Sequence, residues 1–218
     1  MDKVFEGVFS IDGRIATVNL DRGRKVYNEM LTEIGGKEYR FWNPYRSKLS
    51  AAILKGLKNF HIKADSKVLY LGAATGTTVS HVSDIARDGR IYAVEFSERN
   101  MRELIKVCER RKNILPILED ARYTERYEQY IEGVKCDVIY QDVASKEQAD
   151  ILLKNAKFLK KGGYAYFVIK SQSIDISRKP EEVYKEALDK VGGDFEVLER
   201  IGIEPYDSMH MFSVLRKR

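Results

Sequence analysis

Short apolar runs alternate with amphipathic segments along the chain from residue 67 onward. A short apolar run between turn residues is typical of a buried strand, whereas apolar residues spaced three or four apart are typical of a helix packed by one face. The predicted strands cover residues 67–72, 90–95, 114–118, 136–142 and 163–170. Because strands that alternate with helices usually pair in parallel, the pattern predicts an α/β fold with a mostly parallel sheet.

Helices are predicted between these strands, and a hairpin at the end of the chain. The apolar helix faces consist of Met101, Leu104, Ile105 and Cys108; of Leu152, Ala156 and Leu159, stopping at Gly162-Gly163; and of Val183, Ala187, Leu188 and Val191, opening at Pro180. Residues 195–203 and 209–215 have the pattern of two consecutive strands. Added to the five earlier strands, this antiparallel hairpin predicts a Rossmann-like sheet of seven strands.

The first 45 residues have a different character, because their short runs partly alternate between apolar and polar positions. The runs cover residues 4–9, 14–20 and 38–42 and are separated by turn signals at Asp12-Gly13, at 21–23 and at Gly35-Gly36. They predict a small antiparallel β domain of residues 1–47. Ser47 is a candidate cap for a helix of about residues 48–59. This helix opens the second, larger predicted domain, of residues 48–218.

The composition constrains the function only weakly. Of the 218 residues, 44% are hydrophobic and 33% charged, as is typical of a globular protein. The net charge of +5 is compatible with an anionic partner, but many proteins without such a partner are equally basic. On hairpins, the basic residues of the N-terminal part are expected to be solvated edge charges; they are Arg14, Arg22, Arg24, Lys25, Arg40 and Arg46.

Targeting, redox and metal-binding patterns are absent from the sequence. No apolar run approaches membrane length and the N-terminus does not begin a signal peptide, so we expect a cytoplasmic protein without a membrane partner. Cys108 and Cys136 lie in apolar patterns and form no C-x-x-C pair, so we expect reduced core residues. Since His61, His81 and His210 lack the spacing of metal ligands, we expect no metal site.

The most informative motif is Val68-Leu-Tyr-Leu-Gly-Ala-Ala-Thr-Gly-Thr-Thr78, followed by an amphipathic segment to Ala86. It predicts a buried strand, a glycine turn and a helix whose free N–H groups face a ligand. Glu95 ends the next apolar run, where a carboxylate is placed to accept hydrogen bonds from ribose hydroxyls. Together these features indicate a cofactor that contains a nucleoside.

The glycine spacing favours one cofactor over another. The dinucleotide pattern G-x-G-x-x-G would place Ala74 and Thr77 at the second and third glycines, and Ala74 would crowd a pyrophosphate. An NAD-dependent oxidoreductase is therefore disfavoured. The spacing Gly72-x-x-x-Gly76 suits S-adenosylmethionine, which has no pyrophosphate and carries an amino-acid tail.

Charged residues follow several predicted strands at the edge where parallel strands end. Besides Glu95, they are Asp120, Asp142 and Lys170. A single carboxylate after a strand is usually a turn residue or a helix cap, but ligands of such sheets bind along this edge. The joint placement of the charges favours a ligand or catalytic site.

Asp142 and Lys170 permit a structural and a catalytic interpretation. An ion pair between them would compensate two partly desolvated charges, without any further role. The catalytic interpretation adds Lys48 as a second lysine beside the same carboxylate. Burial and repulsion between two ammonium groups would lower the pKa of one lysine, which would then accept the proton of a sugar hydroxyl.

Longer motifs coincide with these candidate residues. They are Asn43-Pro-Tyr-Arg-Ser-Lys-Leu49, the segment Val68 to Val82, Tyr92-Ala-Val-Glu-Phe-Ser97, Glu119-Asp-Ala-Arg122 and Gln141-Asp-Val-Ala144. They closely resemble fibrillarin, and since no glycine/arginine-rich tail precedes them, its archaeal form. The resemblance covers essentially the whole chain. It implies a methyltransferase that uses S-adenosylmethionine to methylate RNA ribose 2′-hydroxyls, in rRNA with tRNA as a further substrate, within box C/D guide ribonucleoproteins.

The resemblance also implies roles for individual residues. The cofactor-binding residues are Gly72, Ala73, Gly76, Thr77, Thr78, Glu95, Phe96, Asp120, Ala121, Asp142, Val143, Ala144 and Ser145. Of these, Thr77 and Thr78 would contact the methionine moiety. Glu95 would hold the ribose, Phe96 would lie beside the adenine, and Asp120 and Ala121 would recognise its edge. The catalytic set comprises Lys48, Asp142 and Lys170, with His210 as the fourth member and Glu204 as the alternative.

The chain carries no recognisable RNA-reading module, which fits target selection by base pairing. The implied partners are a Nop-domain scaffold protein, a kink-turn-binding ribosomal-type protein, a box C/D guide RNA and the target RNA. Tyr123, Tyr127 and Tyr130 are candidate contacts with the scaffold, although core packing is expected for at least one of them. The alternatives are a stand-alone methyltransferase of proteins or small molecules, and a non-catalytic nucleotide-binding subunit.

Overall fold

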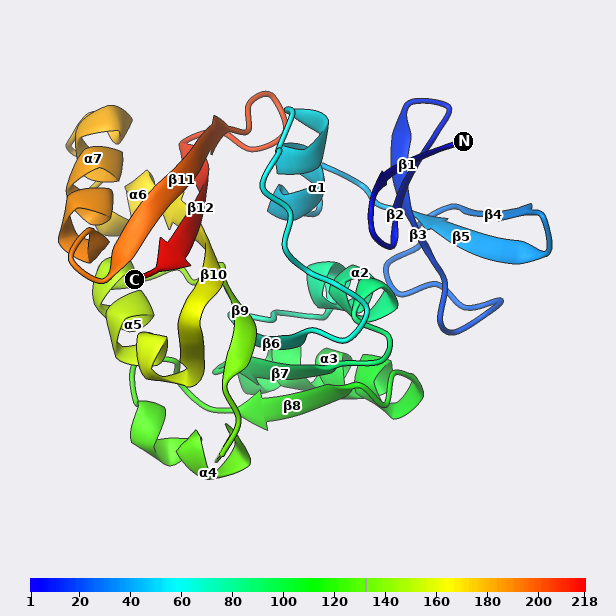
Figure 1. Ribbon diagram of the computed structural model, residues 1–218, viewed down its shortest axis with the longest axis horizontal. Coiled ribbons are helices and arrows are strands. Elements are labelled where there is room, and N and C mark those ends of the chain that lie inside the picture. Colours follow the sequence, from blue (N-terminus) through cyan, green and yellow to red (C-terminus); the bar gives the residue numbers. More distant parts are fainter. Residues whose placement is uncertain (132) are drawn as a thin grey trace.

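Two β-sheets form the framework of the protein, and helix α1 (Lys48–Leu54) follows the first and leads into the second (Figure 1). The computed structural model describes residues 1–131 and 133–218. Within this part of the chain, no helix has the length and apolar character needed to cross a membrane. The same residues contain no cluster of three or more His, Cys, Asp or Glu side chains arranged to hold a metal ion.

The larger sheet has seven strands in the order β11-β12-β10-β9-β6-β7-β8. The strands are β6 (Lys67–Leu71), β7 (Arg90–Glu95), β8 (Ile114–Leu118), β9 (Cys136–Gln141), β10 (Leu159–Lys170), β11 (Phe195–Gly202) and β12 (His210–Lys217). Strands β6 to β10 pair in parallel, whereas β12 is antiparallel to both of its neighbours. The predicted fold class is confirmed, including the terminal hairpin.

Alternate residues of the central strands supply two separate cores. On β6, Val68 and Tyr70 pack with residues of α1, of α2 (Thr77–Ile85) and of α3 (Glu98–Arg110). The intervening Leu69 and Leu71 pack with residues of α5 (Gln148–Asn155) and α7 (Pro180–Val191). Because successive side chains of a strand point to opposite faces, a strand covered on both faces is apolar throughout, as its sequence predicted.

The smaller sheet is antiparallel, with the order β1-β2-β3-β5-β4. Its strands are β1 (Asp2–Phe5), β2 (Val8–Ile11), β3 (Arg14–Val18), β4 (Leu31–Ile34) and β5 (Lys37–Phe41). The predicted run 4–9 is divided by a turn at Gly7, which has a φ of +73°. The sequence analysis missed β4, because it is only half-buried and its apolar pattern is weak.

Two predicted helices end earlier than expected. Helix α1 stops at Leu54 because Gly56 adopts a φ of +91°, and the N–H groups of Gly56 and Leu57 donate to the carbonyls of Ile53 and Ala52. These bonds form the Schellman motif that terminates many helices. Helix α5 stops at Asn155, so the predicted extension to Leu159 is wrong.

A short 3-10 helix, η2 (Ala156–Phe158), follows α5, and β10 begins at Leu159. The glycine pair at 162–163 therefore lies inside a strand, where the register of β10 against β9 shifts. The remaining short elements are η1 (Thr124–Arg126), α4 (Glu128–Ile131) and α6 (Ser171–Ile174). Ile105 of α3, predicted on the apolar face, is exposed, whereas Met101, Leu104 and Cys108 are buried as expected.

Candidate active site

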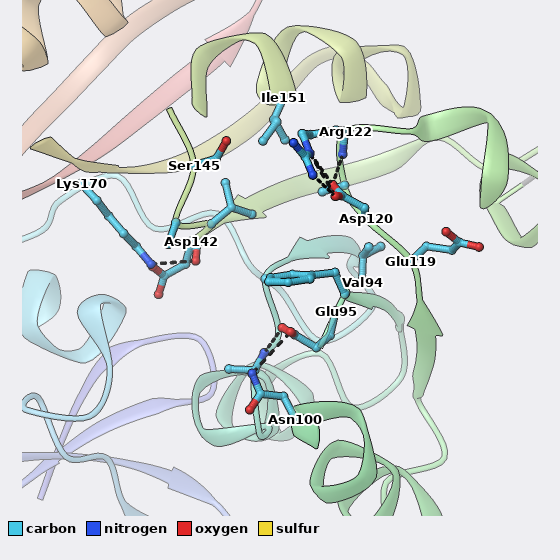
Figure 2. A pocket seen from close by; sticks show the side chains of 16 residues that line it. Val94, Glu95, Asn100, Glu119, Asp120, Arg122, Asp142, Ser145, Ile151 and Lys170 are labelled. Atoms are coloured by element: carbon cyan, nitrogen blue, oxygen red, sulfur yellow. Dashed lines mark hydrogen bonds and ion pairs between the residues drawn. The ribbon is translucent and has the colours of Figure 1, made fainter. Parts of the chain in front are cut away.

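A cavity of about 310 Å³ lies where the parallel strands β6, β7, β8 and β9 end. It is lined by ten residues that the sequence analysis singled out: Gly72, Glu95, Phe96, Asp120, Ala121, Asp142, Val143, Ala144, Ser145 and Lys170. Ala74 of the glycine turn also lines it, as do Asn100 and Arg122, to which no role was assigned from the sequence. Figure 2 shows Lys170 and Asp142 at one end of this cavity, with Glu95 and Asp120 further along it. The strand-end charges thus line one cavity, as their shared edge predicted.

The turn after β6 needs glycine at its first position. Gly72 has a φ of +83°, and a Cβ atom there would lie 2.8 Å from the carbonyl oxygen of Asp142. That separation is shorter than van der Waals contact, so any side chain would push the turns after β6 and β9 apart. Ala74 also adopts a positive φ, of +48°, and its N–H donates to Glu95 Oε2 at 2.8 Å.

Glu95 fixes this turn from the end of β7. Its side chain is buried, and besides Ala74 it accepts a hydrogen bond from the Ser97 N–H at 2.9 Å. Asn100 of α3 approaches the same carboxylate at 3.4 Å (Figure 2). Next to this carboxylate, the Phe96 ring is 72% exposed. An ionised group that accepts several N–H bonds is held in one orientation, with lone pairs left for hydroxyl donors of a ligand.

Asp120 is held by a neighbour that the sequence analysis did not weigh. Arg122 donates to both carboxylate oxygens of Asp120, at 3.1 Å from Nε and 2.6 Å from Nη2. These hydrogen bonds lower the pKa of Asp120 below its ordinary value. The carboxylate therefore stays ionised and acts as a hydrogen-bond acceptor on the wall of the cavity.

Four other predicted cofactor residues, all in the described part of the chain, lie outside the cavity lining: Ala73, Gly76, Thr77 and Thr78. Thr78 is buried and donates to the hydroxyl of Ser47 at 3.0 Å. Ser47 caps α1 by accepting a hydrogen bond from the Ser50 N–H. In the structure, Thr78 therefore connects the start of α2 to the cap of the helix whose first residue is Lys48.

From one end of the cavity outward, basic and acidic side chains alternate along a chain of contacts. Asp142 contacts Lys170 Nζ at 2.7 Å through Oδ1 and Lys48 Nζ at 3.3 Å through Oδ2. The contact between Lys170 Nζ and Asp142 Oδ1 is an ion pair without hydrogen-bond geometry. The Lys170 ammonium donates its hydrogen bond to the backbone carbonyl of Asp142, at 3.0 Å. Lys48 Nζ also lies 3.4 Å from Asp207 Oδ2, and Asp207 Oδ1 lies 2.6 Å from His210 Nδ1. We call Lys170, Asp142, Lys48, Asp207 and His210 the charge chain.

The charge chain differs from the sequence-based expectation at one end. Asp207 was missed, although an acidic residue three positions before a histidine in a turn is a usable signal. The alternative fourth residue, Glu204, is exposed and forms no ion pair with any described residue. The structure thus places His210, and not Glu204, beside the lysine–aspartate–lysine set.

The carboxylates around Lys48 determine its protonation state. Burial by itself lowers the pKa of Lys48, but the carboxylates of Asp142 and Asp207 outweigh it and raise that pKa above its ordinary value. Lys48 is therefore an ammonium ion at neutral pH, so it is not the lysine with a lowered pKa that the catalytic interpretation requires. Asp142 contributes most to this rise, and Asp207, which was not predicted, adds to it.

His210 has the opposite shift. Burial lowers the pKa of His210 below its ordinary value; Asp207 opposes this, while the charges of Lys48 and Lys170 add to it. The imidazole is therefore neutral at pH 7. Because a carboxylate only accepts hydrogen bonds, Nδ1 must carry the proton that it donates to Asp207. The lone pair of this histidine is thus on Nε2.

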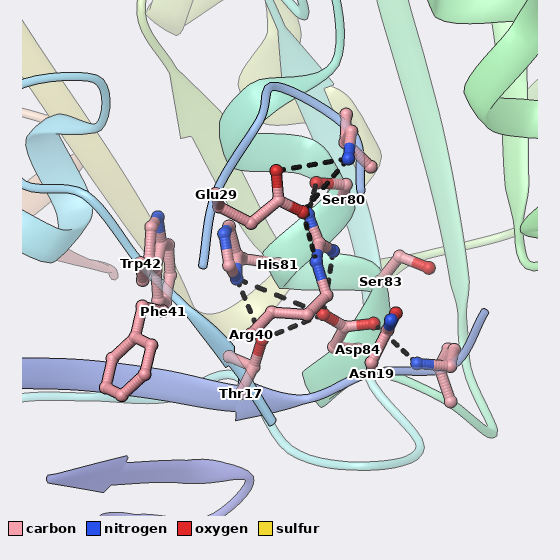
Figure 3. A network of polar contacts seen from close by, with 12 residues as sticks. Thr17, Asn19, Glu29, Arg40, Phe41, Trp42, Ser80, His81, Ser83 and Asp84 are labelled. Carbon is pink, nitrogen blue, oxygen red and sulfur yellow. Dashed lines mark hydrogen bonds and ion pairs between the residues drawn. The ribbon is translucent and has the colours of Figure 1, made fainter. Parts of the chain in front are cut away.

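A buried polar network anchors α2, the helix that follows the glycine turn (Figure 3). Arg40 of β5 is fully buried and donates to Asp84 of α2 at 2.9 Å and to Glu29 at 2.7 Å. Arg111 donates to the other oxygen of Asp84. The expectation that Arg40 is a solvated edge charge is wrong, because its guanidinium donates to Asp84 and Ser80 of α2 and is fully buried.

Comparison with known proteins agrees with the geometry of the site. The Fibrillarin family profile matches residues 1–218. The chain is 49% identical to the "Fibrillarin-like rRNA/tRNA 2′-O-methyltransferase" of Methanocaldococcus jannaschii over 219 aligned positions, covering 97% of this chain and 94% of the relative.

Two solved structures have the same fold. One is Aeropyrum pernix fibrillarin with natively bound S-adenosyl-L-methionine, with a TM-score of 0.85 and 46% identity over 93% of this chain and 88% of that one. The other is a fibrillarin/Nop5p complex, with a TM-score of 0.88 and 39% identity over 98% of each chain. The family profile and these identities extend over nearly the whole length, so this chain belongs to the fibrillarin family.

Proposed function

We propose that this protein transfers the methyl group of S-adenosylmethionine to the ribose 2′-hydroxyl of guide-selected nucleotides, in rRNA and in tRNA. It acts as the catalytic subunit of a box C/D guide ribonucleoprotein. The observation that carries the proposal is the charge chain at the end of the cavity, in a chain of the fibrillarin family. A nucleotide-binding subunit without catalysis would have no use for two lysines around one carboxylate.

The cavity suits S-adenosylmethionine as the methyl donor. Gly72 has no side chain, so the cofactor can approach the backbone there closely. Glu95 presents a carboxylate of fixed orientation, and the exposed Phe96 ring offers a face on which an adenine can pack. When bound, the cofactor supplies a methyl group on a positively charged sulfur. We assign ribose binding to Glu95 and adenine binding to Phe96, Asp120 and Ala121.

Two further parts of the site complete this assignment. The loop Asp142, Val143, Ala144 and Ser145 would line the methyl-donor side of the cavity. Gly72, Ala73, Gly76, Thr77 and Thr78 would shape the turn that receives the methionine moiety. The turn is narrow because Gly72 and Asp142 approach so closely.

Within the charge chain, His210 is the group that accepts the 2′-hydroxyl proton. Its imidazole is neutral with the lone pair on Nε2, whereas Lys48 is held in its charged form by two carboxylates. The ammonium groups of Lys48 and Lys170 stabilise the negative charge that develops on the attacking oxygen. Asp142 holds both lysines, and Asp207 acts as a positioning residue that fixes the tautomer of His210.

This assignment predicts a pH profile. Because neutral His210 is the active form, the single-turnover rate should rise with pH through a pKa below 6.5 and stay level at neutral pH. In Asp207→Asn, the charge that raises the His210 pKa is lost, so the acid limb should move to lower pH. The pH-independent rate at neutral pH should fall about tenfold or more, because the tautomer of His210 is no longer fixed. A lower rate with an unmoved acid limb would mean that Asp207 has only a structural role.

The partners follow from the family and from the proposed reaction. A fibrillarin of the same fold is known in complex with Nop5p, and we assign a Nop-domain scaffold to this chain as well. We further propose the kink-turn-binding ribosomal-type protein, the box C/D guide RNA and the target RNA as components of the particle. Tyr123 and Tyr130 are exposed enough to contact the scaffold, whereas Tyr127 is buried and belongs to the core. The expected cytoplasmic location stays a prediction.

Transfer of labelled methyl from S-adenosylmethionine to RNA tests the proposed function directly. The assay compares the protein alone with the protein plus guide RNA, scaffold and kink-turn-binding protein. We expect label only in the complete particle, at the ribose paired with the guide. Label on peptides or small molecules without guide RNA would instead support a stand-alone methyltransferase. Cofactor binding without transfer in the complete particle would refute guided RNA methylation.

A further inference from the structure

Two adjoining hollows outside the cofactor cavity lie against the N-terminal part of the molecule. The first, of about 550 Å³, lies between residues 21–28 and α3. The second, of about 670 Å³, lies between the small sheet, the start of α1 and Tyr206. Both are lined by Tyr27, Asn28 and Arg46, so they lie side by side. We call this surface the basic groove.

The positive charge of the basic groove is mostly uncompensated. Arg24, Lys25, Arg46 and Arg110 line it and are exposed, and none of them forms an ion pair with a residue in the described part of the chain. Of the acidic residues in its lining, Glu103 is paired with Lys106 and Glu29 is buried against Arg40. Asp21 is the remaining acidic residue of the lining. Many other cations of the protein have a carboxylate partner, for example Lys157 with Glu128. The groove therefore attracts a polyanion.

Aromatic rings accompany these cations. The Arg46 guanidinium lies 5.8 Å from the centre of the Tyr27 ring. Tyr45 is 66% exposed and meets Tyr206 edge to face, with ring centres 5.2 Å apart. Cations for phosphates together with exposed rings for sugars and bases are the features that bind RNA strands. A small free anion would not need such length or such rings.

The groove leads to the proposed reaction centre. Arg46 is two residues before Lys48, and Tyr206 directly precedes Asp207, whose carboxylate lies 3.4 Å from Lys48 Nζ. At the other hollow, Thr75 of the glycine turn forms part of the lining. A strand lying in the groove would therefore pass close to the charge chain.

We propose that the basic groove holds the phosphodiester backbone of the target RNA strand next to the nucleotide that is methylated. Arg24, Lys25, Arg46 and Arg110 bind its phosphates, and Tyr45 packs against a neighbouring sugar. The proposal rests on the proposed function, since it places the substrate of that reaction. It assigns docking of the RNA to this chain, while base pairing with the guide still chooses the nucleotide.

A photo-cross-link tests this contact without requiring methyl transfer. Benzoylphenylalanine replaces Tyr45, and the protein is assembled into the complete particle with labelled target RNA and irradiated. We expect a cross-link to the target strand beside the guide-selected nucleotide, lost when Arg46→Ala and Arg110→Ala are added. Cross-linking only to a protein of the particle would overturn the proposal and identify the groove as a protein interface.

Kinetics of the same particle provide the second readout. Single-turnover methylation by Arg46→Ala/Arg110→Ala should be at least about tenfold slower than wild type at 0.2 M salt. The difference should shrink at low salt, because each lost phosphate contact weakens the salt dependence. The matched control, Lys185→Ala/Lys190→Ala, removes two cations from α7 and should behave as wild type. Equal rates for both double variants would refute the proposal, whereas a wild-type particle that cross-links but transfers no methyl would refute only the proposed function.

Discussion

Asp142→Asn should lower the single-turnover rate of methyl transfer by about a thousandfold while leaving the protein folded. The Asp142 carboxylate is the only group of the charge chain that contacts both Lys170 and Lys48, at 2.7 and 3.3 Å. All three side chains are less than one-fifth exposed. A neutral amide would leave two ammonium groups repelling one another beside the cofactor cavity, and would no longer hold them toward the attacking oxygen.

The measurement is transfer of labelled methyl in the complete particle, with thermal unfolding to verify folding. Asp150→Asn is the matched control, because Asp150 also pairs with a lysine, Lys190 at 2.7 Å, but is much more exposed. The control should retain the wild-type rate. Lys170→Ala provides an independent test of the same centre and should be impaired to a similar extent. A loss of less than tenfold in both active-site variants would show that the charge chain is structural and not catalytic.

Asp84→Ala should lower the free energy of unfolding by about 3–5 kcal/mol, and the melting temperature by about 10 °C. Asp84 is fully buried and accepts hydrogen bonds from the guanidinium groups of Arg40 and Arg111 (Figure 3). Without the Asp84 carboxylate, the buried guanidinium groups of Arg40 and Arg111 repel one another and lack the negative charge that compensates them. The Thr17 hydroxyl, which donates to Asp84 at 2.8 Å, would lose this acceptor and keep only its contact with His81 Nδ1.

Chemical denaturation of the isolated protein measures this effect. Asp189→Ala on α7 is the matched control, since the same substitution there removes an exposed ion pair with Lys185. We expect no measurable change for the control. Equal stability of the two variants would mean that water reaches the network or that the arginines find other partners. The network also joins β5 to α2, so weaker cofactor binding by Asp84→Ala is a further expected consequence.

Much of the fold could be predicted because its determinants are local. The apolar runs of β6, β7 and β9 have no polar face, which in a sequence of this composition requires a strand covered on both sides. Gly72 could be assigned to a tight turn because only glycine suits its backbone and its close neighbour. The predicted helix ends failed at Leu54 and Asn155, since a helix end depends on bonds formed after the last turn. The division at residues 47 and 48 stays a prediction.

The sequence by itself determined the α/β architecture, the cofactor turn and the family, because hydrophobic periodicity, glycine positions and long motifs are properties of consecutive residues. The tertiary structure alone decided that Asp207 joins the predicted cluster and which of its members are charged. Lys48 and Asp142 are 94 residues apart in the chain, and Asp207 enters the same cluster from the turn before β12. The pKa of a group depends on the distance to every neighbouring charge and on burial, neither of which is local in sequence. For this reason Lys48 is held charged and His210 is left neutral. The burial of Arg40 is likewise a result of tertiary packing.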